Sequence, residues 1–183
     1  MTTGVTARRR TAWSLVVFMT VRAACSLYAA GTVTSEGVEL TNADHWHADG
    51  ITGAGIKVGI LDGGFRGYTD TVAVGELPNI PSDHVHWAPS YVADKKLPDE
   101  GPSEHGVQCA EVVADVAPGA TLYLANYRTQ DEFLAAADWL IGQDVDIISC
   151  SAGNATWGPG DGAGAVCDKV AEASAAGILW VQA

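Results

Sequence analysis

Residues 56–64 read IKVGILDGG, an apolar run that closes on an acid and two glycines. A short apolar run bounded by turn residues is typical of a strand buried in a parallel sheet. The carboxyl end of this predicted strand carries Asp62. Because ligands of open α/β sheets lie beyond the carboxyl ends of the strands, Asp62 is the first candidate functional residue.

Helix and strand patterns alternate after this strand. Apolar residues recur at helical spacing over 105–115, and a T-x-x-E capping box at Thr129 opens a second helix that runs to about residue 141. A third helix is predicted over 165–176, with Gly177 as its C-terminal cap. The predicted strands that separate these helices lie at 121–125, 145–150 and 178–181.

This alternation predicts an α/β fold, an open and mostly parallel sheet with helices on both faces. The sequence stops within the last predicted strand, and a buried strand is an unusual terminus, so we expect a domain truncated at its C-terminus. The segment 65–101 is polar and rich in turn residues. We expect loop there, with 83–88 as the best candidate for a short strand.

The composition excludes several classes of protein. A length of 183 residues suits one domain behind a leader segment. Apolar residues make up 48% of the chain and charged residues 17%, which favours a buried core and argues against disorder. The formal net charge of −12 opposes binding to a phosphate backbone, so no nucleic-acid partner is expected.

Basic residues gather at the start of the chain. Arg8, Arg9 and Arg10 precede the apolar stretch Ala12–Val21, which suits the core of a signal peptide and is too short for a membrane span of about 20 residues. We therefore predict a leader and short linker over 1–40, a secreted, extracellular protein and no stable membrane span. A cytosolic amphipathic extension is the alternative.

The cysteines form no recognisable framework. They are widely spaced and make no C-x-x-C pair, which favours buried free thiols over a zinc or disulfide scaffold. The four are Cys25, Cys109, Cys150 and Cys167.

Two further motifs lie where the predicted fold would place a site. His105-Gly106 opens a predicted helix, and Ser151-Ala152-Gly153 directly follows a predicted strand. Together with Asp62, they form three blocks in sequence order at the functional edge of the predicted sheet.

These blocks resemble the subtilisin-like serine peptidases, the S8 or subtilase family. The glycine-led strand 53–62 is similar to that family's first catalytic block, and 104–106 with 116–120 resembles its catalytic helix and the stretch after it. The segment 146–153 is similar to the strand that lines the substrate cleft. The resemblance covers about 43–183, and we assign 41–183 as a partial subtilisin-like peptidase domain.

The resemblance implies a serine endopeptidase acting on polypeptides. Asp62 would accept the Nδ1 hydrogen of His105, and His105 would take the proton of a serine hydroxyl. Ser151, Ala152 and Gly153 would pair with extended substrate as an added strand. No cofactor is expected, and calcium is kept as an unassigned candidate. The oligomeric state is left open.

Several departures from the family pattern matter. The family usually has Thr where this chain has Val107. The segment 177–183 resembles the strand that leads into the family's Ala-Gly-Asn block, whose Asn donates to the oxyanion, and the sequence stops before that block. The Gly-Thr-Ser block with the nucleophile is absent too. We therefore predict that this chain is inactive alone.

Other readings of the same residues compete with this one. Three alternative sites have weaker support. They are Ser151 as a nucleophile, Cys109 as a thiol nucleophile on the helix of His105, and a dinucleotide site at the glycines around residues 53–64. The pairs His45/His47 and His84/His86 have a spacing that can serve zinc, but surface or packing roles are favoured. A non-catalytic α/β binding module is the alternative function.

Overall fold

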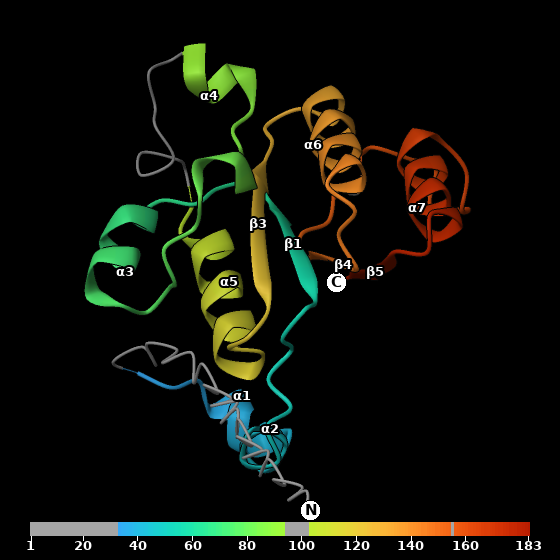
Figure 1. Cartoon of the computed structure of the whole chain (residues 1–183). Helices are drawn as coiled ribbons and strands as arrows, with labels where there is room; N and C mark the ends of the chain where they lie inside the picture. Colours follow the sequence, from blue (N-terminus) through green and yellow to red (C-terminus); the bar gives the residue numbers. More distant parts are fainter. Residues whose placement is uncertain (1–32, 94–102, 155) are drawn as a thin grey trace, which may run out of the picture.

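The computed structural model describes residues 33–93, 103–154 and 156–183. Its centre is a five-stranded sheet in the order β2-β3-β1-β4-β5, with every neighbouring pair parallel (Figure 1). The strands are β1 (Lys57–Asp62), β2 (Val85–His86), β3 (Thr121–Asn126), β4 (Ile147–Cys150) and β5 (Leu179–Gln182). The predicted α/β class with an open parallel sheet is confirmed.

Helices cover both faces of the sheet. The helix α5 (His105–Val116) lies on one face with α3 (Tyr68–Val74) beside it, whereas α6 (Gln130–Gly142) and α7 (Ala165–Ala175) lie on the other (Figure 1). The short helices α1 (Glu36–Leu40) and α2 (Ala43–Ala48) precede β1, and α1 contacts α5. The remaining short elements are the 3-10 turn η1 (Ser82–His84) and α4 (Pro89–Ala93).

The pleat of β1 decides which way Asp62 points. Val58 and Ile60 pack in the cluster that contains Val107 of α5, whereas Leu61 packs in the cluster formed with α6 and α7. Successive side chains of a strand face opposite sides of the sheet. Asp62 therefore shares the α5 face with Ile60 and points toward the start of that helix.

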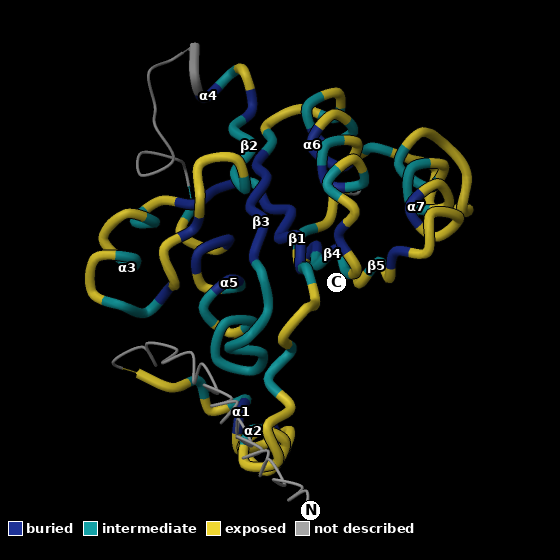
Figure 2. The backbone as a smooth tube through the Cα atoms, in the orientation of Figure 1, coloured by how far each residue is buried: buried dark blue, intermediate teal, exposed yellow. Residues whose placement is uncertain are grey.

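Burial is greatest in the central strands. Five of the six residues in both β1 and β3 are buried, whereas none of the four in β5 is buried (Figure 2). The core thus surrounds the strand that carries Asp62.

The structure agrees closely with the predicted elements after residue 104. The capping box is formed, since Thr129 Oγ1 accepts a hydrogen bond from the Glu132 amide at 3.2 Å. Gly177 follows α7 with φ +86°, as its predicted role as a cap requires.

The main error lies in 65–101. Strand pairing over 83–88 is limited to Val85–His86, and α3 forms where loop with short strands was predicted. This helix has seven residues and begins and ends at glycines with positive φ. Its core contacts come from Tyr68 and Val72, a stripe too short for a sequence pattern to reveal.

The predicted leader and Cys25 fall mostly on residues 1–32, which lie outside the described residues. The described part of the predicted linker contacts the domain, because Val38 is buried and the Ser35 amide donates to Asp115 Oδ2 at 2.6 Å. Among the described residues, no helix is both long and apolar enough to cross a membrane.

Candidate active site

Asp62 is a buried carboxylate with two defined partners. It is the last residue of β1 and only 3% exposed. Its Oδ1 accepts a hydrogen bond from the Gly64 amide at 3.1 Å, and its Oδ2 lies 2.6 Å from His105 Nδ1. The turn after β1 and the first residue of α5 therefore orient both carboxylate oxygens.

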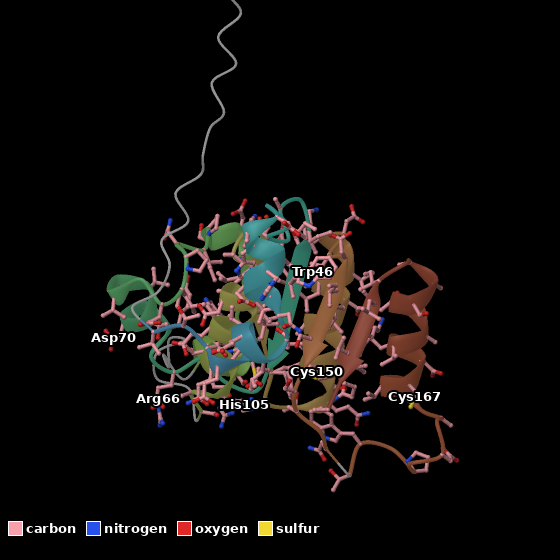
Figure 3. All side chains as sticks on the ribbon, turned by 90° about the horizontal axis from the view of Figure 1, so that it is seen from below. Trp46, Arg66, Asp70, His105, Cys150 and Cys167 are labelled. Atoms are coloured by element: carbon pink, nitrogen blue, oxygen red, sulfur yellow. The ribbon has the colours of Figure 1, made fainter. Side chains whose placement is uncertain are left out.

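His105 is the more accessible member of the pair. Its side chain is 47% exposed, against 4% for that of Asp62, and in the view of Figure 3 it lies between Arg66 and Cys150. The Ser103 hydroxyl accepts a hydrogen bond from the His105 amide at 3.0 Å, which holds the start of the helix. Glu104 pairs with Arg66 at 2.9 Å across the same turn.

Gly106 allows the helix to approach the strand. A Cβ at this position would lie 2.6 Å from the Gly64 carbonyl oxygen and 2.9 Å from Asp62 Cβ. Backbone and buried atoms cannot yield to such a contact without a shift of the helix. The glycine after His105 is thus what lets the imidazole reach Asp62.

The pairing sets the chemistry of the imidazole. A carboxylate that accepts the Nδ1 hydrogen leaves Nε2 with its lone pair. This nitrogen belongs to a half-exposed side chain, so a hydroxyl in contact with it could transfer its proton there. The arrangement is that of an oriented general base.

The segment Ser151–Gly153 reaches the same edge of the sheet. It directly follows β4, which pairs in parallel with β1, so both strands end on this side. The Ala152 carbonyl accepts a hydrogen bond from Gln182 Nε2 of β5. The predicted cleft segment and the Asp62–His105 pair thus lie at neighbouring strand ends.

Ala152 and Gly153 line a cavity of about 750 Å³. Its wall includes the rings of Tyr127, Phe133 and Trp157, which pack 5.0–5.6 Å apart. The cavity thus offers an apolar surface beside the segment expected to pair with substrate.

A second cavity of about 350 Å³ is lined by Gly63 and Gly153 together, beside Tyr91 and Arg128. The turn after Asp62 and the predicted cleft segment therefore bound the same space.

The structure adds polar residues that sequence reasoning missed. The Asn126 amide oxygen, at the buried end of β3, accepts from the Ala88 amide at 2.6 Å. Tyr91 donates its hydroxyl hydrogen to the Gly63 carbonyl at 2.5 Å, which fixes the turn after Asp62. A polar residue at the end of a buried strand was a signal for Asn126, whereas no local pattern indicated Tyr91.

The cysteines correct one expectation. Cys150 is buried, but Cys109 and Cys167 are only partly so, because each lies on a helix flank rather than on a strand between two layers. Burial raises the pKa of the Cys109 thiol. These three described cysteines are free.

Three of the four paired histidines contact other parts of the protein. His45 and His47 lie on a helix, α2, and His47 Nε2 is 2.9 Å from the Val116 carbonyl oxygen. His84 stacks on Tyr123 and His86 on Trp139. The His45 side chain is 78% exposed, so the favoured surface or packing roles fit these four positions.

Comparison with known proteins agrees with this geometry. The model of the subtilase family matches residues 53–183. Subtilisin DY of Bacillus licheniformis is 29% identical over 163 residues, which cover 80% of this chain and 53% of that protein. Subtilisin E of Bacillus subtilis (strain 168) is 25% identical over 135 residues, which cover 66% of this chain and 32% of that protein. The chain therefore spans about half, or less, of these relatives.

Proposed function

Because this chain belongs to the subtilase family, we propose that it provides the acid and the base of a serine-type endopeptidase. Asp62 is the acid and His105 the base. The observation that most directly supports this proposal is the 2.6 Å contact between Asp62 Oδ2 and His105 Nδ1, made by a buried carboxylate and a half-exposed imidazole.

The proposed reaction moves one proton through His105. Nε2 takes the hydrogen of a serine hydroxyl as its oxygen attacks the peptide carbonyl, and then returns that hydrogen to the leaving amine. Asp62 stays ionised and stabilises the imidazolium formed between these steps. The carboxylate also keeps Nδ1 protonated, so that Nε2 is the nitrogen that faces the hydroxyl.

The 183 residues contain no Gly-Thr-Ser block that would carry the nucleophile. Their Ala-Gly-Asn sequence at 152–154 follows β4, whereas the family's oxyanion block is expected after β5. We propose that the full-length gene product supplies both and that these 183 residues alone are inactive. Ser151 is a poor substitute, because residue 149 is Ser rather than the first Gly of a G-x-S-x-G turn.

The substrate is proposed to be an extended polypeptide that pairs with the backbone of 151–153. The aromatic cavity beside this segment supports the proposal, since it suits an apolar side chain. Secretion also remains a proposal, resting on the basic and apolar start of the chain. No cofactor is proposed for the reaction, and calcium stays an unassigned candidate.

A fluorophosphonate probe tests the proposal on the full-length gene product. We expect covalent labelling of one serine and loss of labelling in His105→Ala, because the probe reacts only with an activated hydroxyl. A non-catalytic α/β binding module would stay unlabelled. Absence of labelling of the folded full-length protein would therefore support the binding module and refute the peptidase.

A further inference from the structure

The turn after Asp62 consists of two consecutive glycines, Gly63 and Gly64. The peptide group that joins them supplies the amide that donates to Asp62 Oδ1 at 3.1 Å. Because neither glycine has a Cβ that restricts the backbone dihedrals, this peptide group would rotate easily without a further constraint. The orientation of the Asp62 carboxylate therefore depends on what holds the peptide group of the turn.

Tyr91 holds the other end of the same peptide group. The carbonyl oxygen of this group belongs to Gly63 and accepts the Tyr91 hydroxyl hydrogen at 2.5 Å. In a planar trans peptide the carbonyl oxygen and the amide hydrogen point in opposite directions, so fixing the oxygen also fixes the direction of the Gly64 N–H. A hydrogen bond to the carbonyl also strengthens the bond that the amide donates. Tyr91 thus acts on Asp62 Oδ1, which leaves Oδ2 for the imidazole.

The phenol is itself held in place. Tyr91 is 2% exposed, and the Arg128 guanidinium lies 5.4 Å from the centroid of its ring. Burial raises the pKa of Tyr91, so the hydroxyl retains the hydrogen that it donates. The ring is therefore a fixed donor.

Two side chains from the end of β3 and the start of α6 anchor the residues just before Tyr91. Asn126 Oδ1 accepts from the Ala88 amide at 2.6 Å. The Glu132 carboxylate accepts from the amide and from the hydroxyl of Ser90, each at 2.9 Å. Three hydrogen bonds thus fix the segment from which Tyr91 reaches the glycine turn.

We propose that Tyr91 is a positioning residue, which fixes the peptide group between Gly63 and Gly64 and through it directs the Asp62 carboxylate at His105. Its effect on the reaction rate rests on the proposed function, whereas its effect on the geometry of the Asp62–His105 pair does not.

Tyr91→Phe removes the hydroxyl and keeps the ring. Asp62 then samples orientations in which Oδ2 is displaced from His105 Nδ1. Because a displacement of about 1 Å can cost a factor on the order of 10² in rate, we expect kcat to fall about tenfold. KM should stay the same, since the hydroxyl acts on the base and not on the substrate.

Hydrogen exchange of assigned amides, measured by NMR spectroscopy on the full-length gene product, tests the inference without reference to activity. In Tyr91→Phe the Gly64 amide should exchange about tenfold faster or more, because its peptide group rotates more freely. The Gly106 amide, which donates to the Gly64 carbonyl at 3.0 Å, should keep its exchange rate. The resonance of the His105 Nδ1 hydrogen should shift, because it reports the contact with Asp62 Oδ2.

The matched control is Tyr68→Phe, which removes a hydroxyl that donates to the Ile80 carbonyl at 3.5 Å rather than to the glycine turn. It should leave both NMR readouts and kcat unchanged. A second variant, Ser90→Ala, removes one of the bonds to Glu132 and should change the readouts in the same direction as Tyr91→Phe, by a smaller amount.

Several outcomes would overturn the inference. Unchanged Gly64 exchange or unchanged kcat in Tyr91→Phe would do so, as would equal changes in Tyr68→Phe. Faster exchange of Gly106 together with Gly64 would mean that the start of the helix had loosened as a whole. If Tyr91→Phe fails to fold, unchanged Gly64 exchange in Ser90→Ala decides against the proposal.

The inference and the proposed function can fail separately. Faster Gly64 exchange in the Tyr91→Phe variant of a protein that no fluorophosphonate labels would uphold the control of Asp62 by Tyr91 and refute the peptidase. A labelled enzyme in which Tyr91→Phe leaves this exchange unchanged would do the reverse.

Discussion

The central strand β1 and the strand β5 belong to one sheet but differ in how firmly they are held. β1 pairs with β3 on one edge and β4 on the other, and five of its six residues are buried. Within the described part of the chain, β5 pairs with β4 alone, and its residues Leu179 and Val181 are 59% and 50% exposed. The candidate acid lies at the end of the better-held strand.

This difference explains how a carboxylate can be buried and still precisely oriented. Hydrogen bonds on both edges and side chains on both faces leave β1 little freedom to shift, so Asp62 stays within 2.6 Å of His105. A polar group at the end of a strand held on one edge would move more. Rigid placement of the residues that do chemistry is what a general base needs.

The largest expected effect tests whether the end of β1 carries the chemistry. In the full-length enzyme, Asp62→Asn should lower kcat by a factor on the order of 10⁴, because the amide no longer holds the imidazole in the required tautomer. Hydrolysis of a peptide substrate measures this. Asp70→Asn, at an exposed acid of α3, is the matched control and should leave the rate unchanged. Equal rates for both variants would remove Asp62 from the mechanism.

Next in size is the difference in packing between the two strands. Leu124→Ala in β3, beside β1, should cost about 2–5 kcal/mol of unfolding free energy, since its side chain is fully buried. Leu179→Ala in β5 should change it by no more than about 0.5 kcal/mol, because that side chain is largely exposed. Denaturant unfolding of both variants measures the contrast. Similar losses would mean that β5 is as well packed as the centre.

A smaller effect is expected where α5 approaches β1. Gly106→Ala should lower the free energy of unfolding by about 1–3 kcal/mol, because the new methyl group would meet the Gly64 carbonyl and Asp62. Gly142→Ala at the end of α6 is a suitable control, since a Cβ there meets no atom within 4 Å and alanine favours helix. In thermal unfolding, the midpoint of Gly106→Ala should lie below that of the parent protein, and the midpoint of Gly142→Ala should equal or exceed it.

The smallest effect concerns β2, the strand at the other end of the sheet. Burial lowers the pKa of His86 from its ordinary 6.5, so the unfolded chain binds the proton more readily than the folded one. Stability should therefore fall as the pH drops through 6.5 toward the lowered value. His86→Phe retains an aromatic ring to stack on Trp139 and should reduce this dependence. Thermal midpoints of both proteins at several pH values check this prediction. A dependence of the midpoint on pH that is the same in the variant would contradict it.

Sequence reasoning located the pair because local signals coincide with a general rule of the fold. An apolar run that closes on Asp62 predicts a strand end, and His105-Gly106 at the head of an apolar-periodic segment predicts a helix start. Both lie within a residue of their observed positions. It missed α3, because that helix is short and mostly exposed. It also missed the contacts of Tyr91 and Asn126, because these depend on partners far along the chain rather than on local periodicity.

By itself, the sequence determined β1 and the alternation of helices and strands after residue 104, since hydrophobic period, caps and turn residues are local properties. Only the tertiary structure decided that Asp62 points toward α5, that Cys109 lies beside the imidazole, and that aromatic rings from separate elements gather beside residues 151–153. The physical reason is that side chains distant in the chain meet according to strand register and helix packing. Both are set by the packed core as a whole.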